Sequence, residues 1–440
     1  MDALRAILEK RKQGMPFAGI PSFCTANELA IEACLRQALR FDDPVLVEAT
    51  ANQVNQFGGY TGMTPANYRD LVYRIADGVG FPREKIILGG DHLGPLTWQS
   101  EPEEIAMGNA AELVRQFVEA GFKKIHLDTS MRLSGDPASL PVETVARRGA
   151  ALYAVCEAAY QRLRRDNPQE ARPAFIIGSE VPIPGGAQEA EDSVSVTEPG
   201  AVRETLRVYR EQFAKRGLDG AFDNIIGIVV QPGVEFGDGE VFRYDRAKAA
   251  ALVRAMREQK GIVMEGHSTD YQPPQALKEM VEDGIAILKV GPALTFALRE
   301  GLFALSEMER LLLPEAQWAR FPEALEAAML REPDNWKKYY SGTEAEQALK
   351  RKFSFSDRCR YYFAKEGVGR TVEKLFCNLS GVAIPMGLLH QYLPNQYAKV
   401  RAGTLPPEPR RLAGDCVVHL VEDYNYATKL NYMIADALLH

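Results

Sequence analysis

An acidic side chain and an imidazole stand side by side at Asp91 and His92, directly after the apolar run 86–90 (IILGG). A buried strand that stops at such a pair places a proton-transfer group beside a metal ligand. In a barrel of alternating strands and helices, the carboxyl ends of the strands carry the chemistry. The segment therefore predicts a catalytic position at Asp91 and a metal-binding position at His92.

Acids and imidazoles follow several other apolar runs in the same way. A divalent cation needs three or four ligands from different elements, usually imidazole nitrogen and carboxylate oxygen. We expect metal ligands at His92, Glu180 and His267, because alternate strands of a barrel contribute to one layer of side chains. Asp128 is the expected fourth ligand. Any one histidine could be purely structural, but the whole group favours a metal site.

Two of these assignments have a structural alternative. Asp91 could shuttle protons, or it could hold His92 in one tautomer, and the sequence leaves both open. His126 lies inside the run 124–128 and is predicted to be structural. The other three histidines are predicted to be surface or packing residues: His390, His419 and His440.

Polar residues near the expected metal site are candidates for substrate binding. The candidates are Asn52, Gln56, Gln231, Ser268, Thr269, Lys289, Arg358 and Arg360. Lys289 ends an apolar run and could form a Schiff base if its pKa were lowered, although an ion pair with a neighbouring acid is the favoured interpretation.

A phosphate group is one ligand that some of these residues could bind. Barrels place phosphate after the seventh and eighth strands, where Ser268 and Thr269 offer hydroxyls; simple helix capping is the alternative. Arg358 or Arg360 could supply the companion cation, or could pair with Asp357.

Motifs of several other enzyme classes are absent. The chain has no GxGxxG after a predicted strand, and no GxxxxGK[ST], GxSxG or HExxH. Nicotinamide chemistry, P-loop phosphoryl transfer and serine hydrolysis are therefore disfavoured.

Eight short apolar runs, each followed by a helix-period segment, must position these residues. The runs are 17–20, 45–49, 86–90, 124–128, 174–178, 225–230, 262–265 and 285–291. Thr64 before Pro65 predicts one helix start, and Ser100 with Glu103 predicts a capping box at the next. Continuous apolar strands that alternate with helices indicate a parallel sheet covered on both sides. Eight such units predict a (β/α)8 barrel, an α/β TIM barrel, over residues 1–305.

The β-strand signal fades after residue 305. Helices are expected at 306–332, 343–352, 371–379 and 409–437, separated by turns rich in proline and glycine. Residues 306–440 are therefore predicted to form a helical extension packed on the barrel.

The amino-acid composition limits the kinds of partner that the chain could bind. Of the 440 residues, 46% are hydrophobic, and the net charge of −7 argues against nucleic acid. Six scattered cysteines are typical of a reducing, cytoplasmic location. No signal peptide or membrane span is predicted. The sequence leaves the oligomeric state open, a homo-oligomer included.

Long contiguous segments resemble the family of accessory (Z-type) subunits of class II D-tagatose-1,6-bisphosphate aldolase. They include GGDHLGP (89–95), ANQVNQFGGYTGM (51–63), GSEVPIPGGAQE (178–189), VVQPGVEFGDG (229–239), GHSTDYQ (266–272), LKVGPALTFALRE (288–300) and FSFSDRCRYY (353–362). The resemblance runs from about residue 17 into the C-terminal extension.

That resemblance implies a barrel related to metal-dependent class II aldolases. Asp91 and His92 match the family's acid/base and ligand pair, and His267 matches a second metal histidine. Gln231 stands where the third aldolase histidine is expected. An amide is a poorer ligand, which leaves Glu180 or Asp128 to complete the coordination.

The resemblance also implies two functions, a stabilising subunit of a separate aldolase and a ketohexose 4-epimerase. Our main hypothesis is a metal-dependent epimerase that interconverts tagatose and fructose, or their 6-phosphates, by retro-aldol cleavage with Zn, Mn, Ni or Co. Asp91 or Glu180 would take and return the C4 hydroxyl proton. A non-catalytic aldolase subunit is the alternative, and aldolase activity itself is the third hypothesis.

Overall fold

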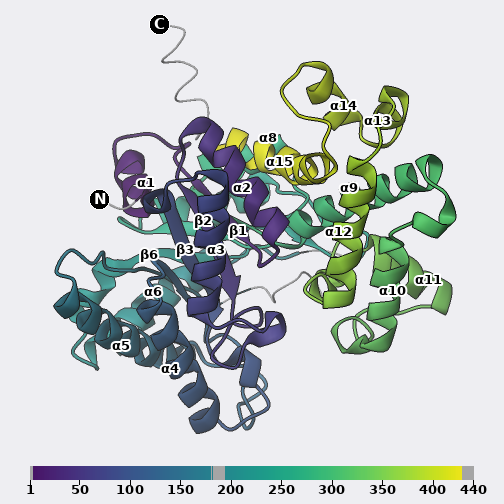
Figure 1. Cartoon of the computed structure of the whole chain (residues 1–440). Coiled ribbons are helices and arrows are strands. Elements are labelled where there is room, and N and C mark those ends of the chain that lie inside the picture. Colours follow the sequence, from purple (N-terminus) through teal and green to yellow (C-terminus); the bar gives the residue numbers. More distant parts are fainter. Residues whose placement is uncertain (1–2, 180, 182–193, 429–440) are drawn as a thin grey trace, which may run out of the picture.

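Eight parallel strands close into a barrel in the computed structural model, which describes residues 3–179, 181 and 194–428 (Figure 1). Around the barrel the strands follow the order β1-β10-β9-β6-β5-β4-β3-β2. Their bounds are β1 (Ile20–Cys24), β2 (Val45–Thr50), β3 (Ile86–Leu93), β4 (Lys124–Leu127), β5 (Ala174–Ile177), β6 (Ile225–Val230), β9 (Val263–Gly266) and β10 (Ile285–Val290). The predicted (β/α)8 barrel is confirmed.

Seven of the eight expected runs overlap their strands closely, and the first is displaced. The run 17–20 precedes β1, whose own sequence is IPSFC. Ser22 pairs with Lys289 on one side and Leu46 on the other, and its side chain is buried. Pro21 and Ser22 interrupt the apolar sequence of this short strand, so it does not form a continuous apolar run.

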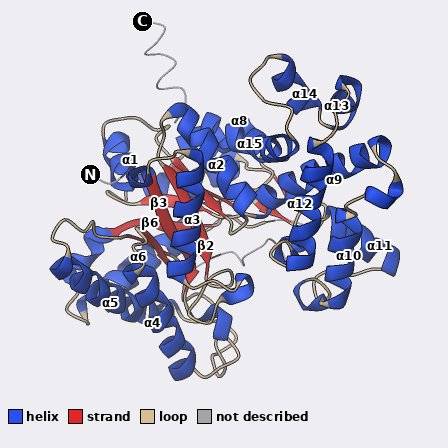
Figure 2. Ribbon diagram, in the orientation of Figure 1, coloured by secondary structure: helices blue, strands red, loops and turns tan. Residues whose placement is uncertain are grey.

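Helices cover the outside of the barrel (Figure 2). They are α2 (Glu28–Phe41), α3 (Pro65–Val79), α4 (Glu103–Glu119), α5 (Val142–Asp166), α6 (Pro199–Ala214), α7 (Arg246–Arg257), α8 (Pro274–Glu282) and α9 (Pro292–Leu312). Thr64 caps α3 as predicted, in a capping box with Asn67. The capping box expected at Ser100 was wrong, because α4 begins after Pro102 and has no side-chain cap.

A short N-terminal helix closes the amino ends of the strands. Leu4 and Ile7 of α1 (Ala3–Lys12) are buried in a cluster with Ile20, Leu46 and Ile87, which lie at or near the starts of their strands. Apolar side chains thus seal one end of the barrel, which leaves the opposite end for chemistry.

The chain after α9 is helical, as expected. It contains α10 (Phe321–Arg331), α11 (Glu344–Phe353), the 3-10 turn η7 (Arg358–Tyr362), α12 (Glu366–Ser380), α13 (Met386–Tyr392), α14 (Pro394–Arg401) and α15 (Pro409–Thr428). The last of these, α15, packs against α2, α8 and α9 of the barrel. The predicted boundary at residue 305 falls inside α9, so a division of the chain into two domains there remains a prediction.

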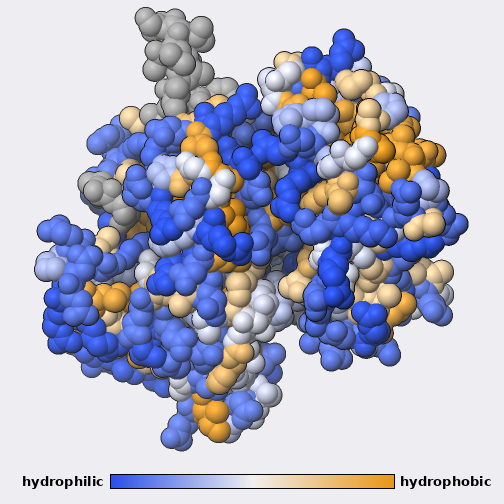
Figure 3. All heavy atoms as spheres, viewed as in Figure 1, coloured by the Kyte–Doolittle hydropathy of each residue, from blue (hydrophilic) through white to orange (hydrophobic). Residues whose placement is uncertain are grey.

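The surface is mostly hydrophilic on the face seen in Figure 3, with apolar side chains gathered near α13. Met386 at the start of α13 and Leu311 near the end of α9 are exposed, by 40% and 60%. Among the residues that the structure describes, no helix is long and apolar enough to cross a bilayer.

Candidate metal and substrate site

A cavity of about 620 Å³ opens at the carboxyl ends of the strands, and η7 of the extension forms part of its wall. Its lining residues are Cys24, Thr50, Asn52, Gln53, Tyr60, Asp91, His92, Phe236, His267, Ser268, Asp270, Lys289, Gly291, Pro292, Arg360 and Tyr361.

An irregularity in β3 brings Asp91 and His92 into this cavity together. A regular strand would direct adjacent side chains to opposite faces. Here the register between β3 and β4 shifts between Gly90 and Leu93, and His92 has a φ of 46°. Positive φ is uncommon outside glycine and clusters at functional sites. The distortion lets both side chains line the cavity.

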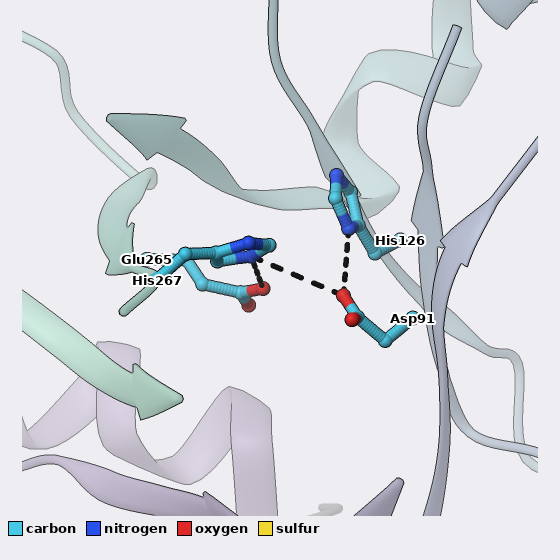
Figure 4. A group of neighbouring side chains, drawn as sticks. All are labelled: Asp91, His126, Glu265 and His267. Carbon is cyan, nitrogen blue, oxygen red and sulfur yellow. Dashed lines mark hydrogen bonds and ion pairs between the residues drawn. The ribbon is translucent and has the colours of Figure 1, made fainter. Parts of the chain in front are cut away.

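Four buried side chains form the core of the site (Figure 4). Asp91, His126, Glu265 and His267 each bring one potential ligand atom to within 4.8 Å of the others. His126 Nδ1 lies 2.8 Å from Asp91 Oδ1. His267 Nε2 lies 2.9 Å from Glu265 Oε1 and 3.9 Å from Asp91 Oδ1. The structure therefore places His126 in the cluster, whereas the sequence suggested a role in packing alone.

The contacts of His126 leave one of its nitrogens unsatisfied in either neutral tautomer. The backbone N–H of His92 and the carboxylate of Asp91 both face Nδ1. If Nδ1 carries the proton, it donates to Asp91, and the buried Nε2 then has a lone pair with no partner among the described residues. If Nε2 carries the proton, that N–H has no acceptor. The nitrogen drawn toward Asp91 is Nδ1, so Nε2 is a buried nitrogen without a partner among the described residues whichever tautomer is present.

His92 is held by a different carboxylate. Its Nδ1 lies 2.8 Å from Asp128 Oδ2, and its Nε2 lies 3.4 Å from Asp91 Oδ2. The ring of His92 lies 4.8 Å from that of His267 and 5.2 Å from that of His126. Asp128 also accepts from Ser130. Asp128 thus orients His92 and lies outside the four-residue group. The sequence suggested instead that Asp128 would be the fourth ligand.

Two buried ammonium groups lie beneath the cluster. Lys124 Nζ lies 2.6 Å from Glu48 Oε1 and 2.8 Å from Glu265 Oε2, and all three side chains are fully buried. Lys289 Nζ contacts Asp91 and lies 3.3 Å from Glu48 Oε2. Gly89 makes room for this network, because a Cβ at that position would lie 2.5 Å from Glu48 Oε1. Lys289 therefore forms the ion pair that the sequence analysis favoured over a Schiff base.

Burial and these charges shift the pKa values in opposite directions. Loss of hydration lowers the pKa of His126 and of His267 to about 4, so both rings are neutral near pH 7. Burial alone would raise the pKa of Glu265, but the Lys124 ammonium and the His267 ring bring it below its ordinary value. The pKa of Glu48 is also below its ordinary value, because the ammonium groups of Lys124 and Lys289 outweigh the effect of its burial. Its carboxylate stays ionised.

The donor set and the charge balance fit a divalent cation. Four buried carboxylates face only two ammonium groups in this region: Glu48, Asp91, Asp128 and Glu265 against Lys124 and Lys289. Buried charges are normally paired or bound to metal. Imidazole and carboxylate together suit Zn, Mn, Ni or Co. Asp91, His126, Glu265 and His267 are the residues that would hold such an ion, with His92 beside them.

Half of the expected substrate-binding residues line the cavity. They are Asn52, Ser268, Lys289 and Arg360. Asn52 accepts a hydrogen bond from Thr97, and Ser268 has a φ of 53° next to His267. Glu180, which was expected to be a ligand and a catalytic group, lies outside the described residues, so its role remains a prediction.

The other four expected substrate-binding residues do not line the cavity and have structural partners. Gln56 donates to the backbone of Asn109, and Gln231 accepts from the amides of Gly233 and Val234. Thr269 donates to the backbone of Lys289. Arg358 stacks on Tyr339 and donates to the backbone of Asn335. Substrate contact by these four side chains remains a prediction.

The start of α9 also differs from the expected phosphate site. The side chain of Asp270 accepts hydrogen bonds from the amides of Gly291 and Ala293, at 3.0 and 2.9 Å. Burial raises the pKa of Asp270 to about 6, although those two amides stabilise its charged form. A carboxylate of the chain itself thus occupies the position after the eighth strand where many barrels bind phosphate.

Sequence reasoning missed several members of the network. Glu48 and Glu265 lie within short apolar strands, and Lys124 is the first residue of another. Charged residues are almost never fully buried unless paired. A lysine and two glutamates in otherwise apolar strands are therefore the signal that could have found this layer.

Comparisons with known proteins identify the family of this chain. Residues 4–429 match the profile of the family described as D-tagatose-1,6-bisphosphate aldolase subunit GatZ/KbaZ-like. The chain is 46% identical to the D-tagatose-1,6-bisphosphate aldolase subunit GatZ of Salmonella dublin, over 96% of this chain and 98% of the relative. GatZ of Salmonella enteritidis PT4 shows the same identity and coverage.

A solved structure from Sinorhizobium meliloti 1021, described as a probable tagatose 6 phosphate kinase, is similar over 93% of this chain and 100% of its own. Its TM-score is 0.85 at 48% identity. The resemblance read from the sequence motifs is confirmed, and this chain belongs to the GatZ/KbaZ-like family of D-tagatose-1,6-bisphosphate aldolase subunits.

Proposed function

We propose that this chain is a metal-dependent 4-epimerase that interconverts D-tagatose and D-fructose, or their 6-phosphates. The observation that carries the proposal is the buried cluster of Asp91, His126, Glu265 and His267 beside a cavity at the carboxyl ends of the strands. Burying several carboxylates and imidazoles together costs free energy, which a subunit that only stabilised another protein would have no reason to bear.

The chemistry of the substrate selects the route. In a 2-ketohexose the hydrogen on C3 is acidic, because it is α to the carbonyl, whereas the hydrogen on C4 is not. Inversion at C4 therefore requires oxidation of C4 or reversible cleavage of the C3–C4 bond. Cleavage needs no redox partner, and the sequence offers no dinucleotide-binding motif.

In the cleavage step a base removes the proton of the C4 hydroxyl. C4 becomes an aldehyde, the C3–C4 bond breaks, and its electron pair moves through C3 to the oxygen on C2. The aldehyde turns and is attacked on its other face, and the proton returns to the C4 oxygen. A bound divalent cation would supply Lewis-acid stabilisation of the negative charge that develops on the substrate.

Asp91 is our candidate for the group that moves the proton. It lines the cavity, and Lys289 contacts its carboxylate. This contact holds the Asp91 carboxylate in place at the wall of the cavity. Asp128 fixes the orientation of the His92 ring, and that ring lies next to Asp91 at the wall of the cavity. Glu180 is the second candidate for proton transfer.

Epimer formation tests the proposal directly. The purified chain would be incubated with fructose, tagatose and their 6-phosphates, with added Zn²⁺, Mn²⁺, Ni²⁺ or Co²⁺ and with a chelator. We expect the C4 epimer to appear only with metal, to disappear in Asp91→Asn, and to persist in His390→Ala, an exposed histidine of α13. Absence of the epimer under every metal would refute the proposal.

A stabilising aldolase subunit is the second candidate function, and the names of the relatives favour it more directly than they favour an epimerase. It predicts a complex with a class II aldolase catalytic subunit and a longer half-life of that partner's activity. Co-purification and heat-inactivation rates of the partner, with and without this chain, would measure both.

Aldolase activity of the chain alone is the third candidate. Gln231, at the position that the resemblance assigns to a metal histidine, bonds loop amides instead of facing the cavity. Release of triose phosphate from tagatose 1,6-bisphosphate by the purified chain would support this function and argue against a purely stabilising one.

A further inference from the structure

We infer that a second cleft, separate from the cavity of the candidate metal site, binds a small oxyanion of the phosphate class. The cleft lies between α2 of the barrel and a part of the extension, namely the end of α14, the loop after it and the start of α15 (Figure 1). Among the described residues, none lines both this cleft and the cavity at the carboxyl ends of the strands. The inference is therefore independent of the proposed function.

Cationic side chains predominate in the wall of this cleft, whose volume is about 790 Å³. Five cationic residues line it, and only two acidic residues do. The cations are Arg36, Arg40, Lys399, Arg410 and Arg411, and the acids are Glu32 and Asp415. Guanidinium groups that converge on one space favour a bound anion, and their planar set of donors matches phosphate in particular.

The two acids of the cleft already have partners. Glu32 accepts a hydrogen bond from Arg36 at 2.7 Å and lies 3.7 Å from Arg410. Asp415 accepts from Lys399 at 3.0 Å. Arg410 and Lys399 also pair with acids that do not line the cleft. These carboxylates are thus neutralised, and the balance of charge depends on the two remaining arginines.

Arg40 and Arg411 carry the uncompensated charge. Among the described residues, no carboxylate lies within ion-pair distance of either guanidinium, whereas the other three cations of the cleft all have one. The guanidinium of Arg40 lies 5.3 Å from the centroid of the Phe41 ring, a contact that uses none of its N–H donors. Arg40 belongs to the barrel and Arg411 to the extension, so a bound anion would bridge the two.

A buried amide lines the same cleft without a partner. Gln37 of α2 is only 4% exposed. Among the described residues, none forms a hydrogen bond with its side chain, although a buried amide that lacks a partner costs free energy. A ligand oxygen in the cleft would accept a hydrogen bond from this amide. Gln37 is therefore an observation, independent of the arginines, that points to a ligand.

The start of α15 adds backbone donors to this wall. The first hydrogen bond of the helix runs from the amide of Leu412 to the carbonyl of Glu408, so the amides of Arg410 and Arg411 precede it. Such early amides have no carbonyl partner within their helix and lie at the positive end of its dipole. Phosphate commonly binds at this position of a helix. Free phosphate and a phosphate ester share this chemistry.

Equilibrium binding tests the inference on the full chain. Inorganic phosphate and glycerol 3-phosphate would each be titrated calorimetrically, in the presence of a chelator, into the wild-type chain and its variants. The variants are Arg40→Gln, Arg411→Gln, the combination of these two, Arg411→Lys and Gln37→Leu. Arg370→Gln removes an exposed arginine of α12 outside the cleft and is the matched control. Melting curves would establish that each variant folds.

We expect one phosphate to bind per wild-type chain. Arg40→Gln and Arg411→Gln should each weaken binding roughly 10- to 100-fold, because each removes a charge-assisted hydrogen bond. Gln37→Leu should weaken it roughly 3- to 10-fold, since a neutral hydrogen bond is weaker. Arg411→Lys should retain part of the affinity and Arg370→Gln all of it.

The two probes also separate the possible sources of the anion. Tighter binding of glycerol 3-phosphate would identify a phosphate ester as the ligand class, and tighter binding of inorganic phosphate would identify the free ion; both results support the inference. Three results would overturn it: binding of neither probe to the wild-type chain, unchanged binding to the folded double variant, or an equal loss of affinity in Arg370→Gln.

Discussion

Metal-linked stability gives the sharpest test of the ligand set, and His126→Ala is the substitution to make. A ligand that binds only the folded chain stabilises it by RT ln(1 + [L]/Kd), which is about 2.7 kcal/mol at 100 times Kd. Unfolding entropy of about 2.1 cal/mol/K per residue over 440 residues gives roughly 0.9 kcal/mol/K. The wild-type melting temperature should therefore rise by about 3 °C with the correct metal.

Loss of a direct ligand should reduce this shift almost to zero. Loss of a residue that only orients a ligand lowers metal affinity about 10- to 100-fold, so loss of a direct ligand should lower it by about 100-fold or more. At the same metal concentration, metal binding would stabilise the His126→Ala chain by only about 0.4 kcal/mol, which raises its melting temperature by roughly 0.5 °C. A purely structural histidine would instead lower both melting temperatures and leave their difference unchanged.

Differential scanning fluorimetry with Zn²⁺, Mn²⁺, Ni²⁺ or Co²⁺ against a chelator measures the difference. His390→Ala, an exposed histidine that packs on Tyr397, is the control and should keep the full shift. A folded His126→Ala chain that still gains about 3 °C would refute the assignment of His126 to the metal site.

Three further predictions concern charges elsewhere in the barrel. Lys124→Met should destabilise the chain by about 3–5 kcal/mol, because it leaves the buried Glu265 without an ammonium partner and Glu48 with Lys289 alone, and adding Glu48→Gln should recover part of this in thermal melts. Asp128→Asn should lower metal affinity roughly 10- to 100-fold by releasing His92, which a metal titration would detect. Burial raises the pKa of Asp43 in the folded chain from 3.8 to about 6, so its neutral form is favoured and stability falls as pH rises through that window. Asp43→Asn should therefore stabilise the chain above pH 6 by about 1 kcal/mol, a figure reduced because the group is partly exposed, and no gain at pH 8 would contradict this.

The barrel could be predicted because its strands are buried on both faces. Runs such as 225–230 (IIGIVV) contain only apolar residues and match β6 at both ends. β1 could not be predicted in this way, because it contains Pro21 and Ser22 and is recognisable only from its pairing with β2 and β10.

Residues of the site could be predicted only where they lie at the ends of strands. Asp91, His92 and His267 follow that rule and line the cavity. His126 and Glu265 do not, because they lie within strands and reach the cluster from inside the barrel. The bulge that turns Asp91 and His92 to the same side is a backbone conformation, and no residue type in that segment requires it.

The hydrogen bonds of α15 have a consequence for how the protein is made. Tyr424 Oη donates to the backbone oxygen of Thr269 at 2.9 Å, in the loop that carries His267 and Ser268. At about 5–20 residues per second, a ribosome adds the intervening 155 residues (424 − 269) in roughly 8–30 s. The barrel strands are all synthesised before this contact can form, so the loop beside the candidate metal ligands at first has only its contacts within the barrel, such as that of the Thr269 hydroxyl with the backbone of Lys289. The support from α15 is therefore added late in biosynthesis.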